Sequence, residues 1–189
     1  DLSGAELQLV DVKGRERRLR KALRKYLKNH DVDYVILDCP PSLGLLTLNA
    51  LVAADEVLLP IQCEYYALEG VTQLMRTIEA VRHAMNKGLR LGSILMTMFD
   101  GRTRLSTQVD EEVRTHFARE TMMTRIPRSV RVSEAPSYSR SVLTYEPTSA
   151  GAVAYREAAA EFARRHAGDD HSTETSVVEH HDASDTKEG

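Results

Sequence analysis

The chain has 189 residues, 42% of them hydrophobic, and its 25 basic and 28 acidic side chains give a formal net charge of −3. No apolar run approaches the ~18 to 20 residues of a membrane-spanning helix, so the sequence argues against a membrane protein and predicts a soluble, cytoplasmic one. The two cysteines, Cys39 and Cys63, have no His or Cys partners at zinc spacing, so we expect buried, reduced thiols rather than a metal site or a disulfide.

Charge divides the chain into two parts. Residues 168–189 contain seven acidic side chains, a single basic one, Lys187, and almost no large apolar residues. A segment of this composition cannot bury enough apolar surface to offset the entropy that it loses on ordering. The sequence therefore predicts a folded domain over residues 1–167 and a disordered acidic tail over residues 168–189.

The first predicted helix covers about residues 14–28, because Leu19, Leu23 and Leu27 recur on one helical face. Charge runs on the other face of such a helix are usually solvated, and binding to nucleic acid is the alternative. The sequence leaves both interpretations open. Glu16 is the only acid in this run, and its nine cations are Lys13, Arg15, Arg17, Arg18, Arg20, Lys21, Arg24, Lys25 and Lys28.

Downstream of this helix, strands and helices alternate. Short apolar runs bounded by Pro, Gly or Asp predict strands, and apolar residues at helical spacing predict helices. The alternation is typical of a three-layer α/β fold, in which helices flank a mostly parallel sheet. Thr103, and Thr148 or Ser149, stand where they can cap helices. The predicted strands cover about residues 32–37, 56–60, 91–98 and 123–126, and the predicted helices about residues 43–54, 68–86, 104–117 and 151–166.

The stretch from Tyr34 to Gly44, Y-V-I-L-D-C-P-P-S-L-G, places one carboxylate at the end of a predicted strand. Pro40 and Pro41 cannot continue the ladder, so Asp38 is expected at the carboxyl edge of the sheet, where α/β folds bind ligands. A Walker B aspartate, which holds Mg²⁺ beside the phosphates of a nucleotide, occupies such a position. An ordinary strand end with a turn-forming Asp shows the same bare pattern.

Longer stretches favour the first interpretation. Residues 33–51 read D-Y-V-I-L-D-C-P-P-S-L-G-L-L-T-L-N-A-L, and residues 60–70 read P-I-Q-C-E-Y-Y-A-L-E-G. Residues 97–106 read T-M-F-D-G-R-T-R-L-S, and residues 126–137 read I-P-R-S-V-R-V-S-E-A-P-S. These segments, in this order, closely resemble the ParA/Soj family of chromosome- and plasmid-partitioning ATPases, which belongs to the deviant Walker A P-loop superfamily. The resemblance covers about residues 1–166.

One motif of that family does not occur in this sequence. The resemblance implies a phosphate-binding loop K-G-G-x-G-K-[ST]-[ST], and neither this loop nor G-x-x-x-x-G-K-[ST] is found among the 189 residues. Because such a loop does most of the phosphate binding, we interpret the chain as the C-terminal part of a P-loop NTPase-type domain without its N-terminal strands. We expect this part alone to hydrolyse nothing. A naturally shortened, inactive paralogue is the alternative.

The resemblance also assigns roles to individual residues. It implies that Asp38 is the catalytic carboxylate and holds Mg²⁺ through water, and that Pro40 and Pro41 belong to a switch that senses the γ-phosphate of ATP. It implies a dimer interface for three loop residues, for which a plain surface loop is the alternative. The implied interface residues are Gln62, Glu64 and Tyr65, and the residues implied to surround the adenine are Met98, Phe99, Pro127 and Arg128.

Two loops carry arginines that the resemblance assigns to sequence-independent DNA binding. Phosphates need only well-placed cations and no base-reading pattern. A solvated surface is the alternative for all of them, and contact with the nucleotide is a further alternative for Arg128. These arginines are Arg102, Arg104, Arg128 and Arg131.

For the whole protein the resemblance implies an ATP hydrolase that serves chromosome or plasmid segregation. It implies that Mg-ATP closes a homodimer, that the dimer binds nonspecific DNA on the nucleoid, and that a ParB-type centromere-binding partner stimulates hydrolysis. No membrane partner is expected, because residues 168–189 do not provide the basic amphipathic anchor of a MinD-like positioning ATPase. Such an ATPase is one alternative, and a non-enzymatic DNA-binding or dimerisation module that has lost its P-loop is another.

Overall fold

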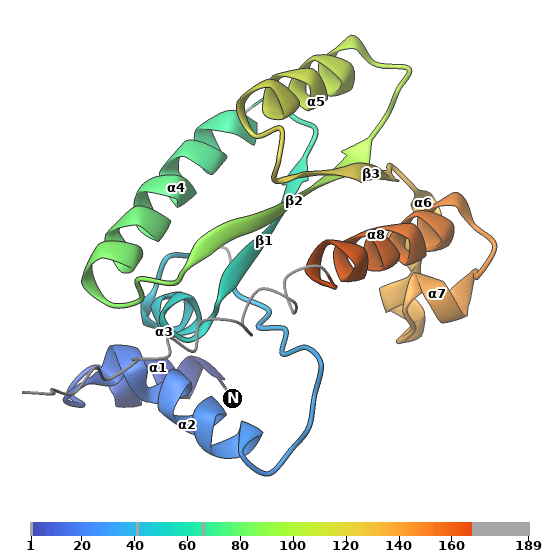
Figure 1. The fold of residues 1–189 in the computed structure, drawn as a ribbon. Helices are drawn as coiled ribbons and strands as arrows, with labels where there is room; N and C mark the ends of the chain where they lie inside the picture. Colours follow the sequence, from blue (N-terminus) through green and yellow to red (C-terminus); the bar gives the residue numbers. More distant parts are fainter. Residues whose placement is uncertain (1, 41, 66, 168–189) are drawn as a thin grey trace, which may run out of the picture.

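The computed structural model describes residues 2–40, 42–65 and 67–167 (Figure 1). Its centre is a sheet of three parallel strands, β1 (Glu56–Gln62), β2 (Arg90–Phe99) and β3 (Thr121–Pro127), in the order β1-β2-β3. Parallel neighbours need crossover connections, and α4 (Ala67–Ala84) and α5 (Arg104–His116) supply them. The predicted α/β fold with a parallel sheet is confirmed.

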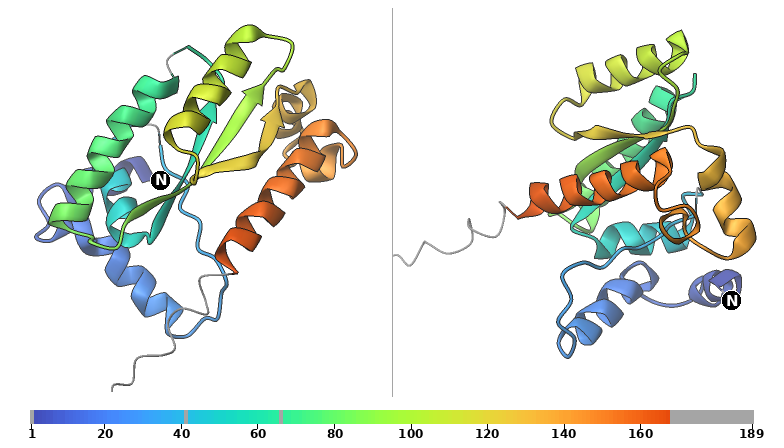
Figure 2. Two further views of the ribbon diagram at one scale, coloured as in Figure 1. Left: turned by 45° about the horizontal axis from the view of Figure 1, so that its top comes forward. Right: turned by 90° about the vertical axis from the view of Figure 1, so that its right-hand side faces the viewer.

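Helices cover both faces of the sheet (Figure 2). Ile61, Ile94 and Met96 point to the face covered by α4 and α5, where they pack with Val71 and Val113. Successive residues of a strand point to opposite faces, so Leu95 of β2 points the other way, to the face that Met122 and Ile126 of β3 also line. Leu95, Met122 and Ile126 pack there against Ala154 and Ala158 of α8 (Ala150–His166). The result is the expected order of helix, sheet and helix.

Local signals in the sequence set the boundaries of α5 and α8. Thr103 Oγ1 accepts a hydrogen bond from Ser106 N at 3.3 Å, and Ser149 Oγ accepts one from Ala152 N at 3.3 Å, so both predicted caps are confirmed. β1 extends beyond its predicted end at Pro60. Because β1 is an edge strand in the described part of the chain, a residue without an N–H is tolerated there.

The N-terminal helices lie on one side of this core. They are α1 (Leu2–Leu9), the 3₁₀ turn η1 (Arg15–Arg17), α2 (Arg18–Leu27) and α3 (Leu45–Ala53). Gly14, with a φ of 68°, permits the turn into η1, so the predicted helix starts with a 3₁₀ turn. α2 packs on α3, and Leu19 N donates a hydrogen bond to Asn49 Oδ1 at 3.2 Å. α1 was not predicted.

Three short elements connect β3 to α8: α6 (Val130–Glu134), the 3₁₀ turn η2 (Ala135–Tyr138) and α7 (Val142–Tyr145). They form a small cluster in which Ala135, Val142 and Ala152 are buried. The rings of Tyr138 and Tyr145 stack, with centroids 4.8 Å apart. This cluster sets the path of the chain from the end of β3 to the start of α8.

The predicted strand over residues 32–37 is wrong. This segment is extended but pairs with no strand in the described part of the chain, and Ile36 is 85% exposed. An apolar run becomes a strand only where a neighbour offers hydrogen-bonding groups. Tyr34 instead lies beside the end of α8, with its ring centroid 6.0 Å from that of Phe162 and 6.5 Å from that of His166.

Cys39 follows this segment and is exposed, so the prediction that it is buried is also wrong, whereas Cys63 is buried as expected. Cys39 was expected near the end of a strand, and that strand does not form. Among the described residues no helix combines the length and apolarity that crossing a bilayer requires. The predicted acidic tail over residues 168–189 lies outside the described residues.

Candidate functional site at the strand ends

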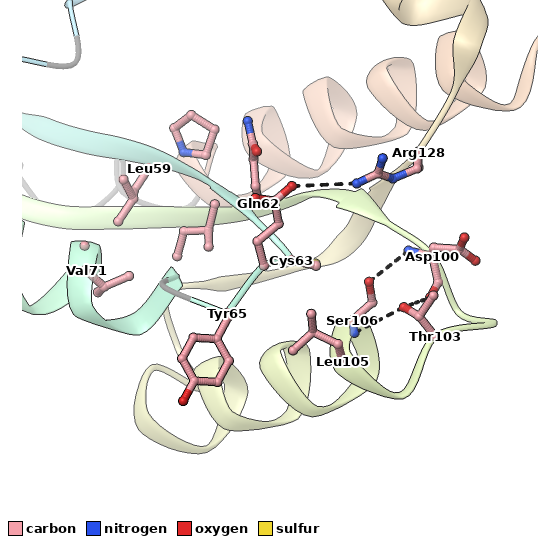
Figure 3. Close-up of a pocket in the computed structure, with 14 residues that line it drawn as sticks. Leu59, Gln62, Cys63, Tyr65, Val71, Asp100, Thr103, Leu105, Ser106 and Arg128 are labelled. Atoms are coloured by element: carbon pink, nitrogen blue, oxygen red, sulfur yellow. Dashed lines mark hydrogen bonds and ion pairs between the residues drawn. The ribbon is translucent and has the colours of Figure 1, made fainter.

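A pocket of about 950 Å³ lies where β1 ends, beside the first turns of α4 and α5 (Figure 3). In parallel sheets this carboxyl edge is where ligands bind. The pocket brings together residues that lie far apart in the sequence, including four of the predicted site residues, namely Gln62, Glu64, Tyr65 and Arg128. We call it the strand-end pocket.

Polar groups from the start of α5 form one wall of the strand-end pocket. Thr103 and Ser106 line it, and Ser106 Oγ accepts a hydrogen bond from Asp100 N at 3.3 Å. The sequence had marked Thr103 only as a helix cap. Its place beside the end of β1 follows from the packing of α5 on the sheet, which local sequence signals do not report.

Asp100 and Arg102 form a bidentate ion pair at the rim of the pocket. Arg102 Nε lies 2.9 Å from Asp100 Oδ1, and Arg102 Nη2 lies 2.8 Å from Asp100 Oδ2. These hydrogen bonds lower the pKa of Asp100 to about 2, so the carboxylate is ionised at neutral pH. Arg102, predicted to bind DNA, is 90% exposed. Its guanidinium already binds both oxygens of the Asp100 carboxylate.

Arg128 connects two of the predicted functional groups. Its Nη2 lies 3.7 Å from Glu64 Oε1, on the loop assigned to the dimer interface. Its backbone N donates to Phe99 O at 2.9 Å, which joins the end of β3 to the end of β2. Arg131 forms a separate pair with Glu134 at 2.9 Å. Arg104 is exposed at the start of α5.

The backbone is strained at the end of β2. Met98 has a φ of 54°, in the left-handed region that few non-glycine residues occupy, and the pairing of β2 with β3 shifts register between Met96 and Phe99. The following ring, Phe99, lies under the guanidinium of Arg125, at 5.2 Å from the centroid. Strained residues of this kind gather at ligand sites, and the position of Met98 and Phe99 beside a base stays a prediction.

An ion-pair network centred on the buried Asp110 lies near Cys63, which lines the strand-end pocket. Asp110 on α5 accepts hydrogen bonds from Arg125 Nε at 2.9 Å and from Arg114 Nε at 3.0 Å. Burial alone would raise the pKa of Asp110, but the hydrogen bonds from both arginines outweigh burial and hold the pKa below its usual value. The neighbouring thiol of Cys63 has its pKa raised to about 11 by burial, so Cys63 is a neutral packing residue of the pocket and not a nucleophile.

Asp38 lies outside the strand-end pocket, on the extended segment between α2 and α3. Its side chain and that of Pro40 are exposed, and Pro41 lies outside the described residues. No cluster of three His, Cys, Asp or Glu side chains that could hold a metal occurs in the described part of the chain. A single exposed carboxylate suits Mg²⁺ only where phosphate oxygens and water supply the other ligands, as they do in nucleotide sites.

Known proteins resemble this chain over most of its length. The AAA domain family matches residues 1–91. The chain is 50% identical to the sporulation initiation inhibitor protein Soj of Bacillus subtilis over 162 residues, which are 86% of this chain and 63% of that protein. It is 50% identical to the chromosome partitioning protein ParA of Myxococcus xanthus over 165 residues, which are 87% of this chain and 58% of that protein.

The chain belongs to the ParA/Soj family. It spans less than two thirds of the length of these relatives, 63% and 58%. Among solved structures, the cobyrinic acid a,c-diamide synthase of Mycobacterium smegmatis with bound ADP and magnesium is 40% identical, with a TM-score of 0.71, over 89% of this chain and 61% of that chain. This ParA/Soj chain thus shares its fold with a protein that holds a magnesium nucleotide.

Proposed function

We propose that the protein is a ParA-type ATPase that segregates a chromosome or a plasmid. Mg-ATP closes a homodimer, the dimer binds DNA without sequence preference on the nucleoid in the cytoplasm, and a ParB-type centromere-binding partner stimulates hydrolysis. The observation that carries the proposal is the 50% identity to two partitioning proteins over 86% and 87% of the chain. Chains that similar share their fold and commonly their chemistry.

ATP and Mg²⁺ are the expected cofactors. A solved structure that is 40% identical holds ADP and magnesium, which supports them. Asp38 supplies an exposed carboxylate, the ligand type that Mg²⁺ takes beside phosphates, and we assign Pro40 and Pro41 to the switch that senses the γ-phosphate. When bound, the magnesium nucleotide supplies the phosphoryl group that is hydrolysed. We assign the contacts with the adenine of the nucleotide to Met98, Phe99, Pro127 and Arg128. Phe99 and Arg128 are joined by a backbone hydrogen bond.

The dimer interface is assigned to Gln62, Glu64 and Tyr65, which are exposed together at the end of β1. Tyr65 is 78% exposed, and tyrosines of this kind are enriched at interfaces. DNA phosphates are assigned to the exposed cations Arg102, Arg104, Arg128 and Arg131. Arg102 and Arg131 already pair with Asp100 and Glu134, so DNA binding at these positions requires phosphates to replace carboxylates.

A non-enzymatic DNA-binding or dimerisation module is the second candidate. It is favoured by one observation, namely that no glycine- and lysine-bearing phosphate loop occurs in the 189 residues. The two candidates differ in whether a nucleotide binds at all. Binding of Mg-ATP therefore separates them directly.

The test compares this chain with the product of the complete coding sequence. The ATPase proposal expects Mg-ATP to raise the melting temperature of the complete product, and DNA together with the partner protein to increase its ATP turnover. It expects Asp38→Asn to reduce both effects strongly, while Asp31→Asn, which neutralises an exposed acid of the same segment, reduces neither. A complete product that ignores Mg-ATP, or full turnover after Asp38→Asn, would overturn the proposal.

A further inference from the structure

A basic surface on η1 and α2 has no role in the proposed ATPase cycle. Arg17, Lys21, Arg24 and Lys28 are all exposed. Lys21, Arg24 and Lys28, spaced three and four residues apart, lie along one stripe of the helix about 4.5 to 6 Å apart along its axis, and Arg17, the last residue of η1, precedes them. We call these four residues the α2 basic stripe. It lies within the run of nine cations between Lys13 and Lys28.

The positive charge of this surface is almost unopposed. Glu16 is the only acid between Lys13 and Lys28, and it pairs with Arg15 at 3.3 Å. In residues 2–40, 42–65 and 67–167, none of the other eight cations forms an ion pair with a carboxylate. The whole chain has a formal charge of −3, so the cations are concentrated here against the overall balance. Such a surface attracts polyanions.

The apolar side of α2 is already occupied. Leu19 and Leu23 are half-buried against α3, and the backbone N of Leu19 is held by Asn49 Oδ1 at 3.2 Å. A helix that binds a lipid bilayer inserts its apolar face, and here only Tyr26 and Leu27, which are 52% and 40% exposed, remain accessible. The arrangement fits a rigid helix that presents cations to a charged backbone better than it fits a membrane-bound helix.

The α2 basic stripe is also separate from the arginines assigned to DNA above. α2 lies at one end of the molecule, beneath α3, and the loop before α5, which carries Arg102, lies with the start of α5, which carries Arg104, at the other end (Figure 1; Figure 2, left). The two surfaces therefore face different surroundings. A ligand on one of them leaves the other accessible.

We propose that the α2 basic stripe is a second binding surface for nucleic acid, which contacts the phosphate backbone of duplex DNA without reading its bases and without nucleotide. A duplex offers one negative charge per ~1.7 Å of its axis, so cations about 4.5 to 6 Å apart can contact phosphates in any sequence. The stripe offers four such cations and no base-reading side-chain pattern, and this is the chemistry of nonspecific backbone contact.

The test measures binding of this chain to a short fluorescent duplex of mixed sequence, without nucleotide, over a series of salt concentrations. The test variant is Lys21→Gln/Arg24→Gln/Lys28→Gln. The control variant is Arg76→Gln/Lys87→Gln/Arg119→Gln, which removes the same charge from exposed positions elsewhere. Circular dichroism confirms that both variants keep their helix content. Because no nucleotide is present, the outcome does not depend on the ATPase proposal.

The proposal expects the test variant to bind about tenfold more weakly at low salt and to lower the slope of log K against log salt by about 2 to 3, one per lost phosphate contact. The control variant should keep the slope of the unmodified chain. Equal losses in both variants would show a response to net charge alone and overturn the proposal. Unchanged binding of the test variant to the duplex would also overturn it. A third contrary outcome is that the chain binds phosphatidylserine vesicles but not the duplex, and that the test substitutions abolish the binding to vesicles.

Discussion

The two edges of the sheet differ in how their backbone groups are satisfied. At the β3 edge, Glu161 of α8 accepts hydrogen bonds from the amides of Met123 at 2.7 Å and Thr124 at 2.8 Å. At the β1 edge, β1 pairs only with β2 in the described part of the chain, and Leu58 is 42% exposed. An edge with covered amides resists further strand pairing, and an uncovered one invites it.

Arg165 extends the cover on the β3 side. It donates to the carbonyls of Arg119, Glu120 and Thr121 at 3.0, 3.2 and 2.9 Å, and it also pairs with Glu161 at 2.8 Å. Side chains of one helix thus replace the strand that would otherwise continue the sheet.

The residues assigned to dimerisation lie at the end of β1 and directly after it, and the segment with Asp38 pairs with no strand in the described part of the chain. At the β3 edge, side chains of α8 satisfy the backbone groups of the strand. The residues assigned to binding roles lie instead near β1 and the segment with Asp38.

The largest effect is expected at the covered edge. Glu161→Ala leaves two strand amides without their acceptor and removes the carboxylate that pairs with Arg165, so we expect it to lower the free energy of unfolding by about 3 to 5 kcal/mol. Urea unfolding followed by circular dichroism measures the change. Glu157→Ala, which removes an exposed acid from the same helix, is the matched control and should cost less than ~0.5 kcal/mol. Similar midpoints for the two variants would contradict the role given to Glu161.

A smaller loss is expected for Asp110→Asn, which neutralises the buried acid between Arg125 and Arg114. The amide keeps one acceptor but leaves two guanidinium groups without a compensating charge, so we expect about 2 to 3 kcal/mol of destabilisation. Glu111→Gln, an exposed neighbour on α5, serves as the control in the same urea titration. If both variants unfold at the same midpoint, the network does not hold α5 to β3.

The covered edge also predicts how stability depends on pH. Burial alone would raise the pKa of Glu161, but hydrogen bonds from the amides of Thr124 and Met123 outweigh it and lower the pKa from 4.5 to about 2. The folded state therefore binds this proton less readily than the unfolded state, and the stabilisation is complete above pH 4.5 and is lost as the pH falls towards 2. Glu161→Gln removes the titrating group, so its unfolding free energy should fall less steeply over this range. Parallel curves for the two proteins would exclude Glu161 as the source of the pH dependence.

The sequence predicted those parts of the molecule whose signals are local. Thr103 and Ser149 cap their helices because a hydroxyl three residues before an amide is sufficient for a cap. Local signals wrongly predicted a strand over residues 32–37, because strand formation also depends on a partner elsewhere in the chain. The resemblance singled out Glu64 and Arg128 for different roles, and the structure places both at one pocket, whereas Ser106 joins them only through the packing of α5 on the sheet.

The smallest effect is expected in residues 32–37. It distinguishes the buried strand that the sequence predicted from the exposed, unpaired segment that the structure shows. A buried central strand would lose about 2 to 5 kcal/mol when an isoleucine is replaced by a small polar residue. Ile36 is 85% exposed, so Ile36→Ser in this chain should change the free energy of unfolding by no more than ~0.5 kcal/mol. Ile94→Ser, at a fully buried position of β2, is the matched control and should cost several times as much in the same urea titration. Equal losses for Ile36→Ser and Ile94→Ser would mean that the segment with Asp38 is packed in a sheet in solution, and the contrast between the two edges would then disappear.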